Sequence, residues 1–326
     1  MNLTPLQLER AAGRHLLALP AQVQPSDLAL LAAARWRGTR SAEGTLALSR
    51  HSALSGPYGL TLSAQRLLAL PAQVGQAWVA ATLTERGEPP FPGAPDATGL
   101  ARAFPEALPH REEGRVVNFL VAAARRLGGA VRFASGTVVC PQPDGALDLT
   151  VYSPIWLGPD QLAQTTRSVG PDLVLATGLQ RRSVRPVPPP SSPVDTLLSA
   201  EERAKLHALL RQRDQALEAA GVVQEAYALE SDLGQAGYVT IQVAVDAEPP
   251  RLIRELPWAA RGVVAYAVRW LPANPGHLAL EFPPEAHLTT RRAMVRQVAG
   301  LAKVIQAKIG TEVLDQDGFP VNPGDL

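Results

Sequence analysis

A chain of 326 residues is long enough for two domains of ordinary size, and 46% apolar with 19% charged residues is typical of a globular protein. The 31 basic and 30 acidic side chains leave a net charge of +1, which gives no bulk electrostatic reason to expect nucleic acid, anionic membranes or acidic substrates. Cys140 is the only cysteine, which excludes an intrachain disulfide and a multi-cysteine zinc site.

The composition also bears on where the protein works. The start of the chain, MNLTPLQLER, lacks the basic and apolar regions of a signal peptide. No uncharged apolar run reaches the roughly 18 residues that a membrane-spanning helix needs. We therefore expect a cytoplasmic protein. Abundant Ala, Leu, Pro and Arg, with few lysines, indicates a GC-rich bacterial genome.

Residues 1–40 are predicted to form a helical lead-in. Thr4 and Pro5 form a helix-start pair, and Pro20 interrupts the apolar positions that follow. A second start at Pro25 precedes an apolar stretch that ends near Trp36. The octapeptide LLALPAQV occurs both in this lead-in and at 67–74, which favours an ancestral duplication.

The first repeat is predicted over about 44–140. Its central feature is an amphipathic helix from Arg111 to Leu127, which Gly128 and Gly129 end. The proline-rich stretch 87–98 reads as a loop. The other predicted elements of this repeat are a strand at 44–49, a helix at 63–70, and strands at 77–84, 131–134 and 137–140. Extra strands of the same domain are predicted at 146–152 and 173–177.

A proline-rich segment divides the chain. Five of the fourteen residues at 181–194 are proline, which favours an extended linker. We therefore predict an N-terminal domain over 1–182, a linker over 183–194 and a C-terminal domain over 195–326. A long helix is expected to open the last domain, because Ser199 and Glu202 form a capping box.

The second repeat is predicted over about 238–318. Its elements are strands at 238–245, 262–270, 277–282 and 311–314, a short helix ending at Leu256, and a long helix at 289–309. Aligning Leu70-Pro71 with Leu256-Pro257 places Trp78 on Val264, and aligning Gly128 with Gly310 matches the helix ends. Each repeat then follows the βαββαβ ferredoxin-like plan, an α+β fold with helices on one face of an antiparallel sheet. The first repeat lacks a counterpart of the 277–282 strand.

Few motifs carry specific chemistry. The chain has no GxGxxG, P-loop, GxSxG, HExxH or CxxC pattern. Glu285 and His287 are the candidates for a metal site, together with Glu281, Asp315 and Asp317, although a turn and solvated side chains explain the same residues. The stretch from His110 to Glu113 could supply an acid/base pair, but acidic residues at a helix start also favour the helix dipole.

These observations favour a non-enzymatic binding or regulatory protein, with a protein partner or self-association and no cofactor. The alternative is an enzyme or a cofactor- or metal-binding protein that uses a cleft between the two repeats, with Glu285 and His287 as candidates. Nucleic-acid binding is a second alternative, because Phe133, Tyr266 and Trp270 alternate with arginines on predicted strands, although core packing is the commoner role of such aromatics.

Overall fold

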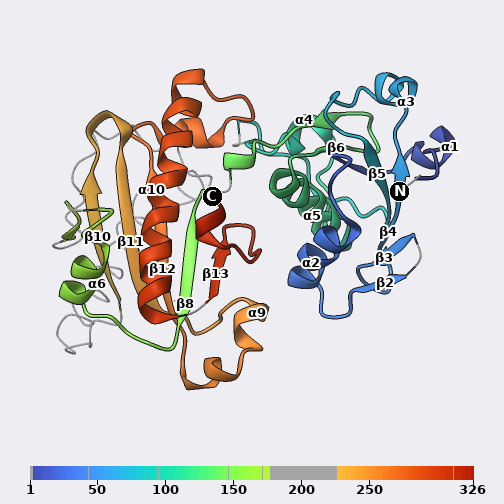
Figure 1. Cartoon of the computed structure of the whole chain (residues 1–326). Helices are drawn as coiled ribbons and strands as arrows, with labels where there is room; N and C mark the ends of the chain where they lie inside the picture. The colour runs from blue at the N-terminus through green and yellow to red at the C-terminus, as the bar shows by residue number, and fades with distance from the viewer. Residues whose placement is uncertain are drawn as a thin grey trace, which may run out of the picture.

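The computed structural model describes residues 3–42, 44–93, 96–145, 147–170, 172–176, 226–310 and 312–326. The predicted linker at 183–194 and the predicted helix start at Ser199 lie outside these ranges. Helices and antiparallel sheets are mixed, which confirms the α+β class. Two sheets lie side by side, and each has helices packed against it (Figure 1). We call the part up to residue 139 the first half and the part from residue 147 the second half.

The first half contains a sheet that has seven strands within the described residues. Helices α2 and α5 cover one face of this sheet, and residues around α1 and α3 cover the other. The strands, in neighbouring order, are β2 (Arg40–Ala42), β3 (Thr45–Ala47), β4 (Ala53–Gly59), β5 (Gln76–Ala81), β1 (Leu16–Leu19), β6 (Ala130–Arg132) and β7 (Val138–Val139). The helices are α1 (Leu8–Ala11), α2 (Pro25–Arg35), α3 (Leu62–Leu67), α4 (Leu100–Ala103) and α5 (Arg111–Leu127).

The second half contains a sheet that has six strands within the described residues. Helices α6 and α10 pack on one face, and α9 packs on the other. The strands, in neighbouring order, are β13 (Glu312–Asp315), β8 (Leu149–Ser153), β12 (Val264–Leu271), β11 (Tyr238–Val245), β10 (Ala226–Asp232) and β9 (Val174–Leu175). The helices are α6 (Pro159–Thr166), α9 (Arg251–Arg254) and α10 (Glu285–Ile309), and 3₁₀ turns occur at η2 (Gly234–Ala236), η3 (Pro257–Arg261), η4 (Pro275–Ala279) and η5 (Pro323–Asp325). A further 3₁₀ turn, η1 (Pro143–Gly145), lies in the connection between the halves.

The two sheets share one strand order. In the first half, β1, α2, β4, β5, α5 and β6 follow one another along the chain, and the strands neighbour in the order β6-β1-β5-β4. In the second half, β8, α6, β11, β12, α10 and β13 give the order β13-β8-β12-β11. Every one of these neighbouring pairs is antiparallel. Additional strands extend each sheet at one edge. In the first half β3 and β2 lie beyond β4, and in the second half β10 and β9 lie beyond β11.

The pairing registers match as well. Leu17 lies between Trp78 on β5 and Val131 on β6. Val151 lies between Tyr266 on β12 and Val313 on β13 in the same way. The position equivalent to Trp78 is therefore Tyr266, two residues beyond the Val264 that sequence alignment assigns. The difference arises because the loops that precede β5 and β12 differ in length.

Three sequence expectations are wrong. Residues 16–19 are not helical but form the central strand β1, whose side chains are buried on both faces, so the polar alternation that marks a half-buried strand is missing. The strands near 146–152 and 173–177 belong to the second sheet rather than to the N-terminal domain, because β8 pairs with β12 and β13, and β9 pairs with β10. The predicted strand at 277–282 is replaced by the 3₁₀ turn η4, where Asn274 accepts a hydrogen bond from the Gly276 N–H.

The halves are joined by the segment that follows β13. Phe319 is fully buried in the hydrophobic core of the first half, where its ring meets Phe119 edge-on at 6.3 Å. Arg125 on α5 forms an ion pair with Asp317 in the same segment. The C-terminal turn thus completes the first core with a side chain from the second half. No helix within the described ranges is both long enough and apolar enough to span a bilayer.

Candidate functional site

A cleft of about 310 Å³ lies where the two halves meet. The first half contributes residues of the β5–α5 connection and the outer end of β7, and the second half contributes the end of β12 and the segment leading to α10. The principal side chains of the lining are Val139, Cys140, Trp270, Leu271, Leu278 and Leu280.

Apolar side chains remain accessible on the second-half wall of the cleft. Leu271, Leu278 and Leu280 are 48%, 43% and 46% exposed, although each lines the cleft. Trp270 also lines the cleft and is almost fully buried. Large apolar side chains that gather in a concave place, rather than scattering singly over the surface, are typical of binding sites.

The charged side chains of the cleft have partners of opposite charge. Arg291 on α10 pairs with Asp144 at 2.6 Å, and Arg125 pairs with Asp317. Glu281 accepts two bonds from the Arg102 guanidinium, at 3.0 Å from Nε and 2.5 Å from Nη2. The lining is therefore apolar with neutralised ion pairs, and it has no strong net attraction for an ion of either sign.

Two further groups in the cleft have pKa values raised chiefly by burial. The pKa of Asp148 is raised because desolvation outweighs Arg269, which lies 3.9 Å away, and the Trp270 backbone N–H. Desolvation also raises the pKa of the Cys140 thiol, even though the residue as a whole is exposed, and the Glu281 carboxylate adds to the effect. A thiol with a raised pKa is mostly protonated near neutral pH and is a poor nucleophile.

The structure does not bring Glu285 and His287 together. Positions two apart on a helix point about 200° apart, so these two side chains leave α10 on opposite faces. Glu285 is exposed and pairs with Arg292 at 3.2 Å. His287 is buried, with its ring 5.3 Å from that of Trp270 and 5.2 Å from that of His277.

The other proposed ligands are also engaged elsewhere. Glu281 binds Arg102, and Asp317 binds Arg125. Asp315 accepts the backbone N–H groups of Asp317 and Phe319, as expected for a turn. Within the described ranges, no three potential metal-binding side chains lie close enough to share an ion.

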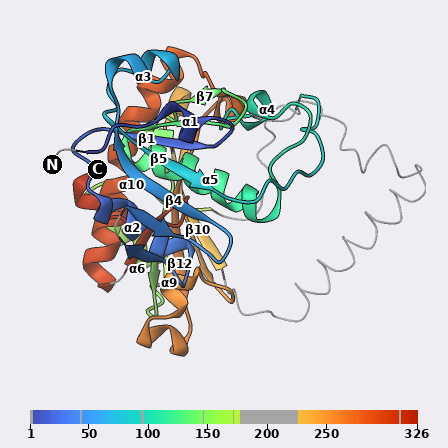
Figure 2. The same ribbon diagram turned by 90° about the vertical axis from the view of Figure 1, so that its right-hand side faces the viewer.

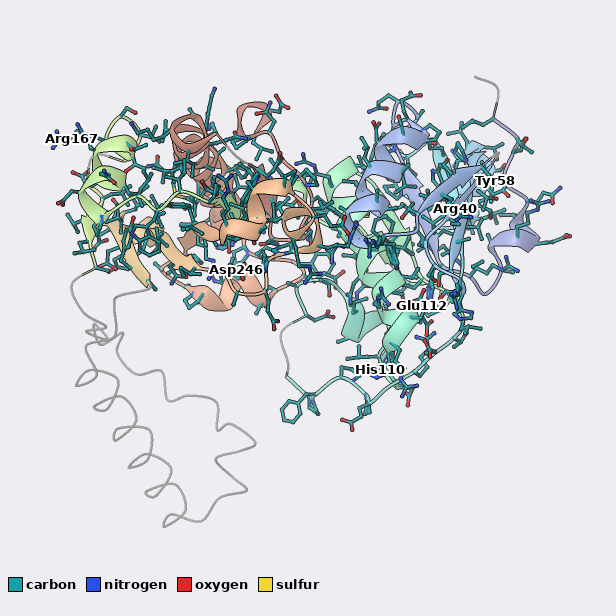
Figure 3. All side chains as sticks on the ribbon, turned by 90° about the horizontal axis from the view of Figure 1, so that it is seen from below. Arg40, Tyr58, His110, Glu112, Arg167 and Asp246 are labelled. Atoms are coloured by element: carbon teal, nitrogen blue, oxygen red, sulfur yellow. The ribbon has the colours of Figure 1, made fainter. Side chains whose placement is uncertain are left out.

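A second ionisable cluster lies away from the cleft, at the start of α5. Glu113 is 1% exposed, and its carboxylate accepts from three donors. One oxygen lies 3.0 Å from His15 Nε2 and 2.9 Å from Arg86 Nη2, and the other accepts the Glu85 N–H at 2.8 Å. A cavity of about 160 Å³ adjoins this cluster. Figure 3 marks the start of α5 by His110 and Glu112.

The bonds around His15 fix its tautomer. Its Nδ1 accepts a hydrogen bond from the Ala134 N–H at 3.1 Å. The proton of the neutral ring is therefore on Nε2, which donates a hydrogen bond to Glu113. Burial lowers the pKa of His15, although the hydrogen bond to Glu113 opposes this shift. Both ring nitrogens are therefore occupied in the neutral imidazole, which leaves no free lone pair to accept a proton from a substrate.

The predicted pair of His110 and the following acids is replaced by another arrangement. The histidine that meets Glu113 is His15, 98 residues earlier in the chain. Glu112 accepts hydrogen bonds from the hydroxyls of Ser49 and Ser52, and these bonds lower its pKa although burial alone would raise it. No local pattern links His15 to α5, because the fold alone brings β1 against the helix start.

The cleft and the buried cluster thus differ in character. The cleft combines accessible apolar side chains with ion pairs, and the cluster around Glu113 is a closed set of satisfied hydrogen bonds. Comparison with protein-family models, with curated proteins and with solved structures finds no match for this chain.

Proposed function

We propose that this protein is a non-catalytic binding protein that holds a short apolar stretch of a partner polypeptide in the cleft between its halves. The observation that carries the proposal is the exposure of Leu271, Leu278 and Leu280 within the concave wall. A cleft of about 310 Å³ is at the small end of ligand sites and accommodates a few side chains rather than a large cofactor.

The strand edge in the cleft favours an extended polypeptide over a compact small molecule. Strand β7 is the outermost strand of its sheet within the described ranges. The Val138 carbonyl accepts from Arg102 Nη2 at 3.1 Å, so it faces away from β6. Backbone groups alternate sides along a strand, so those of Cys140 point away from β6 as well, and Cys140 lines the cleft. A peptide lying along this edge would form main-chain hydrogen bonds and place alternate side chains against the leucines.

The alternatives receive less support from the same residues. An enzyme that used His15 as a base would need a free ring nitrogen, and both are bonded. A nucleic-acid site would need unpaired cations, whereas Arg125 and Arg291 in the cleft both face aspartates.

We also propose that the chain arose by duplication of a ferredoxin-like unit. Gly128 and Gly310 both end a long helix in the left-handed conformation, and Gly136 and Gly318 both turn the hairpin that follows. Each pair is separated by 182 positions. The common strand order supports the same origin, and the boundary between units then falls between 140 and 148, rather than in the predicted linker.

The test is selection from a displayed library of random heptapeptides on the immobilised full-length protein. We expect enrichment of sequences with alternating apolar residues and binding of a synthesised winner in solution. Leu280→Glu, which places a charge in the apolar wall, should weaken that binding at least about tenfold. Leu62→Glu is the matched control, because Leu62 is also exposed but lies on α3. Loss of binding in both variants, or enrichment of no common sequence, would refute the proposal.

A further inference from the structure

A short segment of the first half borders the cleft. We call residues 96–104, which include α4, the strap. Its C-terminal end is anchored in the first half, because Ala103 and Phe104 are buried in that core. Figure 2 shows α4 beside β7. The other end contributes Ala97 and Thr98 to the lining of the cleft.

The strap is attached to the second half by few bonds. The Asp96 N–H donates to the Ala279 carbonyl at 3.0 Å. The Arg102 guanidinium binds Glu281 through both Nε and Nη2. Gly99 has a φ of +69°, and a Cβ at this position would lie 2.6 Å from Glu281 Oε1. Absence of a side chain at Gly99 thus permits the close approach of the strap to Glu281.

We propose that the strap is a latch on the β7 edge of the cleft, where Arg102 also donates to the Val138 carbonyl, and that it must release Glu281 before a partner polypeptide pairs with that edge. This inference rests on the proposed function for its biological meaning. The attachment suits this role because the Arg102 side chain is 46% exposed, so water and salt screen its ion pair. The anchored residues Ala103 and Phe104 keep the strap in place while its free end moves.

Hydrogen exchange of the full-length protein, read by mass spectrometry, measures release of the strap without any ligand. The Asp96 amide can exchange only when its bond to Ala279 opens. We expect Arg102→Ala to accelerate exchange in the strap about three- to fivefold, as loss of a partly exposed ion pair implies, and to leave α5 unchanged. Arg115→Ala is the matched control, because Arg115 also pairs with a glutamate but lies away from the cleft.

A second variant disturbs the close approach of the strap without changing charge. Gly99→Ala introduces a methyl group that must displace either Glu281 or Val139, so exchange in the strap should again be faster. Unchanged strap exchange in both variants, with the protein still folded, would overturn the latch.

The peptide selected from the library then separates the two proposals. If the latch gates entry, Arg102→Ala increases its association rate by the same three- to fivefold. A protein that binds no peptide but shows faster strap exchange in both variants refutes the proposed function and retains the strap as a releasable element. A protein that binds peptide at the same rate in both variants refutes the latch as a gate.

Discussion

The two halves of the molecule have the same strand order but differ at the start of their long helices. At the start of α5, Glu113 is buried and accepts from His15, Arg86 and the Glu85 N–H. At the start of α10, His287 and Arg291 are buried, and His287 Nε2 and Arg291 Nε find no hydrogen-bond partner among the described residues.

The start of α5 is thus fully paired, whereas the start of α10 holds buried polar atoms that lack a partner in the part of the chain that the structure describes. A buried donor without a partner costs about 1–3 kcal/mol, so the start of α10 can gain free energy by rearranging, whereas the start of α5 cannot. Arg291 also lines the cleft. Arg291 Nε is therefore a donor at the cleft that can gain a hydrogen bond when a ligand binds.

The largest expected effect tests the joint between the halves. Phe319 and Thr137 occupy equivalent places in the hairpins that follow β13 and β6, but only Phe319 enters the core of the other half. Phe319→Ala should lower the free energy of unfolding by about 4 kcal/mol, as expected for a fully buried phenylalanine. Denaturant titration measures this, with Thr137→Ala as the control at about 1 kcal/mol or less. Equal losses of unfolding free energy in both variants would show that Phe319 contributes no more to the contact between the halves than Thr137 does.

The next effect compares the two helix starts directly. Glu113→Ala leaves His15, Arg86 and a backbone N–H without their common acceptor, so we expect a loss of about 3 kcal/mol of folding free energy. Glu285→Ala removes an exposed acid from the first turn of α10 and should cost less than about 0.5 kcal/mol. Similar costs for the two substitutions would remove the distinction between the halves.

The pH dependence of stability tests the two buried histidines. Burial lowers the pKa of His15 and of His287 from 6.5. The unfolded chain therefore takes up protons at a higher pH than the native protein does, so stability is complete above about 6.5 and is lost as the pH falls below it. The slope reaches at most about 1.4 kcal/mol per pH unit for each histidine.

Urea titrations between pH 7.5 and 5.5 measure this slope. His15→Gln and His287→Gln should each reduce it, because each removes one group whose pKa differs between the native and unfolded states. A slope that neither substitution changes would assign the pH dependence to other groups.

The sequence predicts the elements whose pattern is local. The helix predicted from Arg111 to Leu127 is confirmed with those bounds, because its apolar positions repeat at helical spacing and Gly128 ends it. The strand predicted at 238–245 is also confirmed. The central strand β1 could not be recognised, since a strand covered on both faces has no alternation of polar and apolar residues.

The sites were harder to predict because their residues are far apart in the chain. The cleft combines Val139 with Leu278 and Leu280, and the buried cluster combines His15 with Glu113. The packing of one half against the other brings the first set together, and the packing of α5 on β1 brings the second set together. Glu285 and His287 show the converse, because closeness in sequence suggested a shared site, whereas helix geometry separates them.

The smallest expected effect tests how similar the two halves are at the ends of their long helices. Gly128 and Gly310 end α5 and α10 with φ of +67° and +60°, and a Cβ added at either would meet open space. Substitution by alanine therefore costs only the left-handed backbone conformation, about 1 kcal/mol at each site. Denaturant titration of Gly128→Ala and Gly310→Ala should give equal losses within about 0.5 kcal/mol, and the double variant should give their sum, because distant sites add. Unequal losses would mean that one helix end is held by contacts that the other lacks, and that the equivalence of the halves ends at their topology.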